Sequence, residues 1–155
     1  MLTNFWNYLT DRLSLTPAQH KWLSLFDYTS VIRPFPEARQ TLRFVRARGL
    51  KVGILSNFGL ASLDRSLKAT NLFDLIDIAC RAAVIGYAKP SPLAYQHITN
   101  ALSVAPHECL FFDDEQSCVD GARAVGMIAH LVDRENECIP LDHLVSDSFA
   151  AISTM

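Results

Sequence analysis

The chain has 155 residues, about the size of one domain, and 50% of them are hydrophobic while 19% are charged. This balance excludes a disordered chain, because enough apolar surface is present to form a buried core. The formal net charge is −2 and the sequence has no run of Lys or Arg, so we expect no nucleic-acid partner and no membrane surface partner.

The first third of the chain is expected to be helical. Phe5, Trp6, Leu9 and Leu13 recur at helical spacing. Residues 16–19, Thr-Pro-Ala-Gln, form a capping box with proline at the first helical position, which predicts a second helix. The apolar face of that helix comprises Ala18, Trp22, Leu25 and Phe26.

A third helix is predicted from Glu37 to Arg48, closed by Gly49. Short apolar runs then alternate with helical segments. The predicted strands are Leu50–Leu55, Leu75–Cys80, Cys109–Phe112 and Met127–Val132, and the predicted helices are Ala61–Thr70, Ser91–Leu102, Ser117–Val125 and one more after Pro140. This alternation indicates a parallel α/β sheet, in which ligands bind beyond the carboxyl ends of the strands.

Two of the predicted strands end at polar residues. Ser56 and Asn57 follow the first strand, and a hydroxyl beside free backbone N–H groups can hold a phosphate oxygen. Asp113 and Asp114 follow the third strand, and adjacent carboxylates are ligands that suit Mg²⁺. For both pairs the alternative is an ordinary helix N-cap.

Lys89 lies between Ala88 and Pro90, just before a predicted helix. The proline disfavours helical geometry at Lys89. The side chain could neutralise a phosphoryl group, and the alternative is a solvated surface lysine.

As an ordered set these segments resemble the haloacid dehalogenase superfamily, most members of which hydrolyse phosphate esters through an aspartyl-phosphate intermediate. Residues 52–57, Val-Gly-Ile-Leu-Ser-Asn, are similar to the second motif of the family, Lys89-Pro90 to the third, and Asp113-Asp114 to the fourth. The resemblance runs from about Arg33 to Val132. It implies a Rossmann-like parallel sheet with flanking helices over residues 34–155, preceded by part of a helical cap over residues 1–33.

The resemblance also implies roles for the motif residues. Ser56 and Asn57 would bind the phosphoryl group, Ser56 and Lys89 would act in catalysis, and Lys89 would offset the phosphate charge. Asp114, with help from Asp113, would hold Mg²⁺. The dehalogenase branch carries Ser-Asn in place of these two aspartates, so the phosphatase branch is favoured. Cys118 and Ser91 depart from the residues common in relatives, asparagine and aspartate.

The family's first motif, Asp-x-Asp-x-Thr, supplies the nucleophile, and no Asp-x-Asp occurs in the sequence. Asp27, within Leu-Phe-Asp-Tyr-Thr, resembles a degraded form of this motif, but the capping box at Thr16 places Asp27 near the end of a helix. We therefore expect a phosphatase-type hydrolase that is inactive or impaired as this chain stands. The alternatives are a non-catalytic phosphate- or metal-binding protein and a subunit completed by a partner chain.

The first-motif strand of the family lies between the Ser56 strand and the Asp113 strand. Without it, those two strand edges must pair directly, remain exposed or be filled by another segment, so we expect marginal stability or oligomerisation. The expected ligand is a small phosphorylated metabolite. Residues 1–13 do not resemble a signal peptide, and the four cysteines have neither a C-x-x-C pair nor the spacing of a zinc site. We therefore expect buried, reduced thiols in a cytoplasmic protein.

Overall fold

The computed structural model describes residues 2–58 and 62–133. The helix predicted after Pro140 and the side chain of Cys138 lie outside these residues. No helix in the part of the chain that is described is both long enough and apolar enough to cross a membrane.

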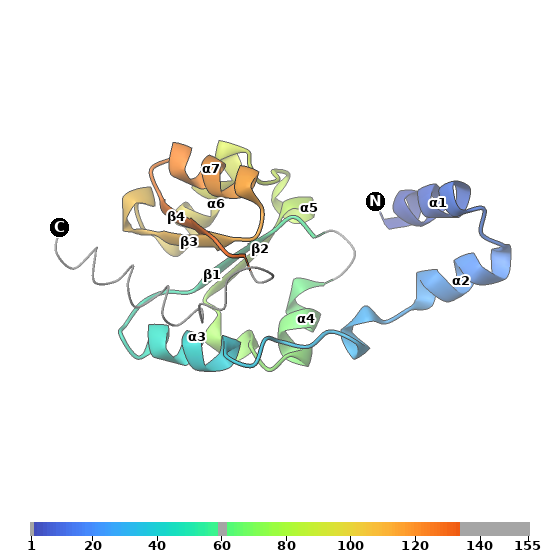
Figure 1. The fold of residues 1–155 in the computed structure, drawn as a ribbon, viewed down its shortest axis with the longest axis horizontal. Helices are drawn as coiled ribbons and strands as arrows, with labels where there is room; N and C mark the ends of the chain where they lie inside the picture. The colour runs from blue at the N-terminus through green and yellow to red at the C-terminus, as the bar shows by residue number, and fades with distance from the viewer. Residues whose placement is uncertain (1, 59–61, 134–155) are drawn as a thin grey trace.

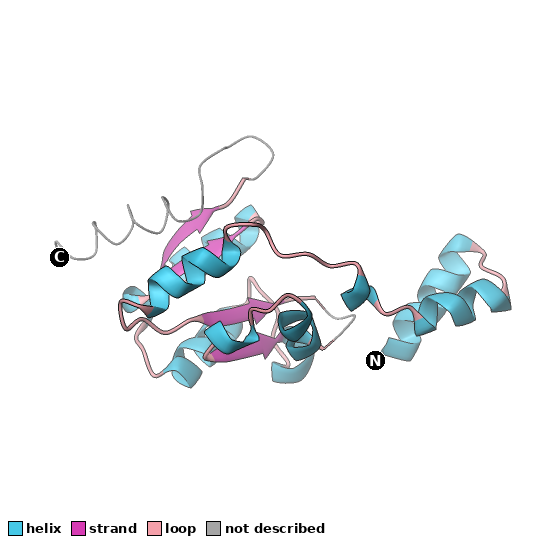
Figure 2. Cartoon of the chain, turned by 90° about the horizontal axis from the view of Figure 1, so that it is seen from below, coloured by secondary structure: helices cyan, strands magenta, loops and turns pink. Residues whose placement is uncertain are grey.

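The two predicted N-terminal helices are present as α1 (Leu2–Leu13) and α2 (Pro17–Leu25), here called the hairpin. The capping box also forms, because Gln19 N donates to Thr16 Oγ1 at 3.3 Å and Thr16 N donates to Gln19 Oε1 at 2.9 Å. The hairpin lies apart from the strands in two perpendicular views (Figures 1 and 2). It contains no buried residue in α2, and Leu25 is 73% exposed.

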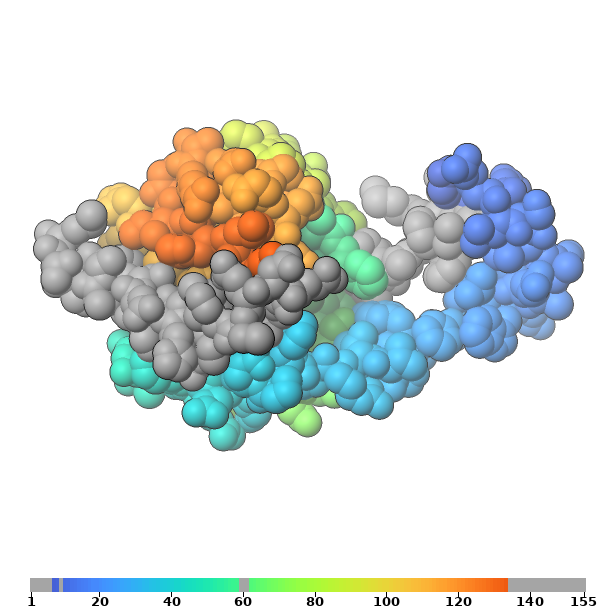
Figure 3. Space-filling view, in the orientation of Figure 1, coloured from blue at the N-terminus to red at the C-terminus, as the bar shows by residue number. Residues whose placement is uncertain are grey.

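A short connection leads from the hairpin to the rest of the molecule, residues 38–133, here called the body. The 3₁₀ turn η1 (Tyr28–Ser30) is followed by α3 (Ala38–Arg46), and Gly49 ends this segment with a φ of +74°. Two ion pairs tie α3 to the rest of the body, Arg39 with Asp74 and Arg46 with Asp77, each at 2.8 Å. The space-filling view shows this connection running along one side of the molecule (Figure 3).

The body contains the predicted parallel strands, and they form two separate pairs. Strand β1 (Gly53–Ser56) pairs with β2 (Ile78–Arg81), with Ser56 opposite Arg81. Strand β3 (Leu110–Asp113) pairs with β4 (Ile128–Leu131), with Asp113 opposite Leu131. Among the described strands β1 and β3 are not hydrogen-bonded to each other, so direct pairing of these two edges does not occur.

Helices connect the strands, three of them where the sequence predicts helices and a further short one at residues 82–85 that was not predicted. They are α4 (Leu63–Ala69), α5 (Ala82–Ile85), α6 (Pro92–Leu102) and α7 (Gln116–Ala124), with 3₁₀ turns η2 (Phe73–Leu75) and η3 (Pro106–Glu108). Helix α4 begins at Leu63, two residues later than predicted, because Ser62 takes an extended conformation and its Oγ accepts a hydrogen bond from Arg65 N at 3.4 Å.

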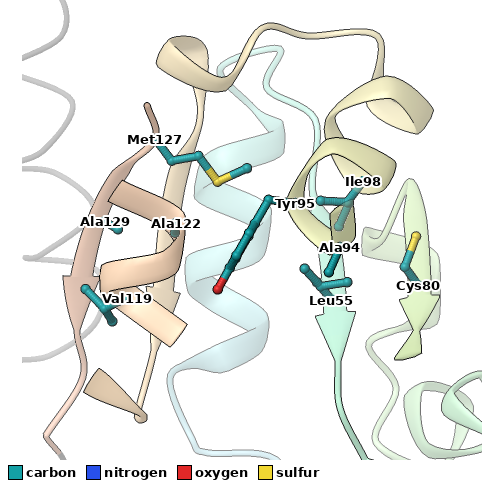
Figure 4. Packing of buried hydrophobic residues seen from close by; sticks show 9 residues of the cluster. All are labelled: Leu55, Cys80, Ala94, Tyr95, Ile98, Val119, Ala122, Met127 and Ala129. Carbon is teal, nitrogen blue, oxygen red and sulfur yellow. The ribbon is translucent and has the colours of Figure 1, made fainter. Parts of the chain in front are cut away.

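One apolar core joins the two strand pairs (Figure 4). The core is formed by side chains from β1, β2, α6, α7, β4 and the residue just before β4. Its buried members are Leu55, Cys80, Ala94, Tyr95, Ile98, Val119, Ala122, Met127 and Ala129. Tyr95 has no exposed surface, and its hydroxyl donates to the Cys118 carbonyl at 2.6 Å. Because both strand pairs contribute to the same buried cluster, we infer that they belong to one folding unit.

Candidate functional site

Ser56 is the last residue of β1 and is half-buried. Its Oγ accepts a hydrogen bond from the backbone N–H of Phe58 at 3.1 Å. The helix that follows is capped by Ser62, so the alternative that Ser56 is an ordinary helix N-cap is wrong. The backbone just after the strand therefore folds back on the Ser56 hydroxyl.

The side chain of Asn57 fixes the backbone of Lys89. Asn57 Nδ2 donates to the Lys89 carbonyl at 2.9 Å, and Lys89 N donates to Asn57 Oδ1 at 2.8 Å. Both ends of the Asn57 side-chain amide are engaged in these two bonds. The phosphate contact expected for Asn57 from the sequence stays a prediction. Sequence reasoning missed this positioning contact, and no local pattern joins residues 32 positions apart.

Lys89 forms an ion pair with Asp113 at the carboxyl end of β3. The Nζ–Oδ2 distance is 2.5 Å, and the two side chains are only 12% and 7% exposed. Lys89 Nζ also lies 5.6 Å from the centroid of the Phe111 ring. Lys89 is therefore not the solvated surface lysine of the alternative interpretation, and its side chain contacts Asp113 at the end of β3.

The two adjacent aspartates differ in their surroundings. Asp113 is engaged through both oxygens, because Oδ1 also accepts a hydrogen bond from Glu115 N at 3.0 Å. Asp114 is exposed. The N-cap position of α7 belongs to Glu115, so neither aspartate occupies it.

These carboxylates fit only part of a magnesium site. No group of three His, Cys, Asp or Glu side chains in the described residues is placed to hold a metal ion. Mg²⁺ commonly keeps several waters and takes one or two protein carboxylates. Asp114, whose carboxylate is exposed, fits this requirement better than Asp113, which is already paired with Lys89.

Two neighbours depart from the common family pattern. Cys118 is 1% exposed, and burial raises the pKa of its thiol, so it packs in the core as a neutral side chain. Its Sγ lies 3.6 Å from Glu115 Oε2. Ser91 occupies the N-cap position of α6 without a side-chain capping bond.

Gly121 in α7 determines how closely that helix approaches the residue after Lys89. A Cβ at this position would lie 2.8 Å from Pro90 Cβ, 2.9 Å from Pro90 O and 2.9 Å from the Tyr95 hydroxyl. Only glycine therefore fits without displacing its neighbours. A glycine in a helix interior was the sequence signal for this contact, and sequence analysis did not use it.

Asp27 lies just after α2, near the end of the helix as the sequence predicted. Its carboxylate accepts hydrogen bonds from Thr29 Oγ1 at 2.7 Å and Thr29 N at 3.1 Å, and pairs with Arg65 at 2.7 Å. Hydrogen bonds from Thr29 lower the pKa of Asp27, and Arg65 adds to the effect. Asp27 is thus the N-cap of η1, because its side chain accepts the hydrogen bond from Thr29 N.

The arrangement brings together the residues of three separate segments. Asn57 bonds to the backbone of Lys89, and the Lys89 side chain pairs with Asp113, so the ends of β1 and β3 are linked through one lysine. A largely buried cation paired with a carboxylate at the end of a strand is a group that can bind an anionic ligand.

Known proteins share the sequence pattern of this chain. The sequence profile of the haloacid dehalogenase-like hydrolases matches residues 5–126. The chain is 42% identical over 137 residues to Phosphatase MT3486 of Mycobacterium tuberculosis, covering 88% of this chain and 63% of that protein. It is 32% identical over 117 residues to (S)-2-haloacid dehalogenase 4A of Burkholderia cepacia, covering 72% of this chain and 51% of the relative.

Solved structures show the same fold. The L-2-haloacid dehalogenase RSc1362 superposes with a TM-score of 0.72 at 26% identity, covering 88% of this chain and 63% of that one. A HAD phosphatase from Thermococcus onnurineus superposes with a TM-score of 0.64 at 21% identity, covering 88% and 78%. The chain thus spans less than two thirds of the length of both curated relatives. From the profile match and the first relative, the chain belongs to the haloacid dehalogenase-like hydrolase family.

Proposed function

We propose that this chain carries the phosphate-binding part of a Mg²⁺-dependent phosphatase of small phosphorylated metabolites. The observation that carries the proposal is the linked set of Asn57, Lys89 and Asp113, which joins the ends of two strands. The 42% identical relative is named a phosphatase, and the aspartates at the carboxyl end of β3, Asp113 and Asp114, favour the same branch over the dehalogenases.

Each group has a chemical task in this proposal. The Ser56 hydroxyl hydrogen-bonds a phosphoryl oxygen. Lys89 offsets the negative charge that gathers on the phosphoryl group, and it does so from a largely buried position where electrostatic effects are strong. Asp114, helped by Asp113, holds Mg²⁺, which supplies further charge neutralisation when bound.

The 155 residues contain no Asp-x-Asp sequence. We therefore propose that the chain as it stands binds phosphate and Mg²⁺ with little or no hydrolysis. The Asp27 carboxylate is hydrogen-bonded to Thr29 and paired with Arg65, so we assign it a structural role in the connection between hairpin and body and not a role in the site.

Calorimetric titration with inorganic phosphate in the presence of Mg²⁺ tests this proposal. We expect binding in the micromolar to millimolar range that is lost in Lys89→Gln and kept in Lys68→Gln, a matched change at an exposed lysine. Absence of phosphate binding by the folded protein would contradict the proposal. A p-nitrophenyl phosphatase activity abolished by Asp27→Asn would instead restore Asp27 as a nucleophile.

A subunit completed by a partner chain is the second candidate. It is favoured by the two separate strand pairs, since β1 and β3 are not paired with each other among the described residues. Native mass spectrometry of the protein from its own cells tests it, with a stoichiometric heterocomplex expected and a lone monomer as the contrary result. The buried free thiols of Cys80 and Cys118 support the proposal of a cytoplasmic location.

A further inference from the structure

An aromatic pair adjoins the candidate phosphate site. Phe58 follows Ser56 by two residues, and its own N–H donates to the Ser56 hydroxyl at 3.1 Å. The Phe58 side chain is 54% exposed, although it is large and apolar. Tyr28 packs against it edge-on, with ring centroids 5.9 Å apart and an interplanar angle of 61°.

Tyr28 is anchored from the other side by α4. Its hydroxyl lies 2.5 Å from Ser66 Oγ and donates to the Ser62 carbonyl at 3.4 Å. The adjacent Asp27 pairs with Arg65 of the same helix at 2.7 Å. The Tyr28 ring is therefore held in place while the ring it supports, that of Phe58, remains open to solvent.

The position of Phe58 is fixed relative to the Ser56 hydroxyl by the backbone hydrogen bond between them. Two residues of extended chain span about 7 Å at most, so the backbone of Phe58 lies within that distance of the backbone of Ser56. Lys89, whose backbone is bonded to the neighbouring Asn57, has its charged side chain paired with Asp113. Phe58 thus offers a ligand an apolar surface beside a polar anchor, a combination typical of selective small-molecule sites.

We propose that Phe58, supported by Tyr28, makes the site select phosphate monoesters whose ester oxygen carries an aromatic or similarly bulky apolar group. The selection rests on the proposed phosphate binding at Ser56 and Lys89. The ring covers the apolar part of the ester after the phosphate has been bound, so it affects the affinity for the ester and leaves the affinity for free phosphate unchanged. Aromatic contacts of this kind favour phenyl phosphate over methyl phosphate by about two- to tenfold.

Calorimetric titration of the full chain with phenyl phosphate, methyl phosphate and inorganic phosphate, each with Mg²⁺, tests the inference. The wild type is expected to bind phenyl phosphate about two- to tenfold tighter than methyl phosphate. Phe58→Ala should remove this preference while keeping the affinity for inorganic phosphate, and Phe58→Trp should retain it. Phe73→Ala is the matched control, because Phe73 is also an exposed phenylalanine, 43% accessible, stacked on Lys68 outside the site.

The outcomes separate this inference from the proposed function. Equal affinities for phenyl and methyl phosphate in the wild type, with inorganic phosphate still bound, would overturn the selectivity alone. A preference that survives Phe58→Ala would overturn the assignment to Phe58. Failure of all three ligands to bind would overturn the phosphate site, and the selectivity with it.

Discussion

Helices α2 and α6 begin in the same way and differ in what their apolar residues contact. Each has a hydroxyl residue at the N-cap followed by proline, Thr16-Pro17 in α2 and Ser91-Pro92 in α6. In α6 the apolar face is buried, with Tyr95 fully covered. In α2 no residue is buried, and Trp22 is 65% exposed.

This contrast separates helix formation from helix burial. Capping and periodicity act within a few residues, so they specify a helix wherever they occur. Burial needs a partner from elsewhere in the chain, and α6 finds one in β1, β2 and α7 while the described residues cover little of α2. The body should therefore respond strongly to changes in apolar side chains, and the hairpin only weakly.

The largest difference is expected between Tyr95→Ala and Trp22→Ala. Removing the buried Tyr95 ring leaves a cavity and deprives the Cys118 carbonyl of its hydroxyl donor, so the free energy of unfolding should fall by about 3–5 kcal/mol. Trp22→Ala should change it by less than about 0.5 kcal/mol. Urea denaturation followed by circular dichroism measures both, and equal losses would contradict the contrast between the two helices.

The ion pair at the site gives the next largest effect. Lys89→Gln leaves the Asp113 carboxylate, which is 7% exposed, without its cation, and we expect a loss of about 2–3 kcal/mol. The exposed pair between Arg65 and Asp27, at the junction with the hairpin, should contribute much less, because solvent screens it. Chemical denaturation of Lys89→Gln and Arg65→Gln compares them, and a larger loss for Arg65→Gln would break the expected order.

Gly121→Ala tests the close approach of α7 to Pro90. The new methyl group would lie 2.8 Å from Pro90 Cβ, and the repacking should cost about 1–3 kcal/mol. Because Pro90 follows Lys89, the same change should weaken phosphate binding. Thermal melts measure the stability and phosphate titrations measure the affinity. If neither the melting temperature nor the phosphate affinity changed, the close packing of Gly121 against Pro90 would not be needed for either.

The smallest effect concerns acid stability. Hydrogen bonds from Arg46 and Val52 N lower the pKa of Asp77 below its usual value of 3.8. A carboxylate whose pKa is lower in the folded state stabilises the protein above the unfolded pKa, and this stabilisation is lost as the pH falls from about 4 through the folded pKa. Asp77→Asn should lower the free energy of unfolding at pH 7 by about 1 kcal/mol and flatten its decrease below about pH 4. An acid limb identical to that of the wild type would contradict the role of Asp77.

Much of the fold was predictable because its signals are local. Apolar runs predicted all four described strands, and two of these runs led directly to the polar residues Ser56 and Asp113 at the strand ends. The bonds from Asn57 to Lys89 and the tight packing of Gly121 were missed because each joins distant segments. The sequence left three outcomes open for the facing edges of β1 and β3, and the described strands show that the two edges are not paired with each other. Strand pairing depends on residues from several distant segments, so local patterns could not choose among these outcomes.

The most direct test of the account is a ¹H–¹⁵N NMR titration of the chain with inorganic phosphate and Mg²⁺. We expect the largest amide shifts at Asn57, Phe58 and Lys89 and in the turn after Asp113, while the amides of α1 and α2 stay unchanged. Saturable shifts confined to the hairpin, or no saturable shift at the ends of β1 and β3, would contradict it.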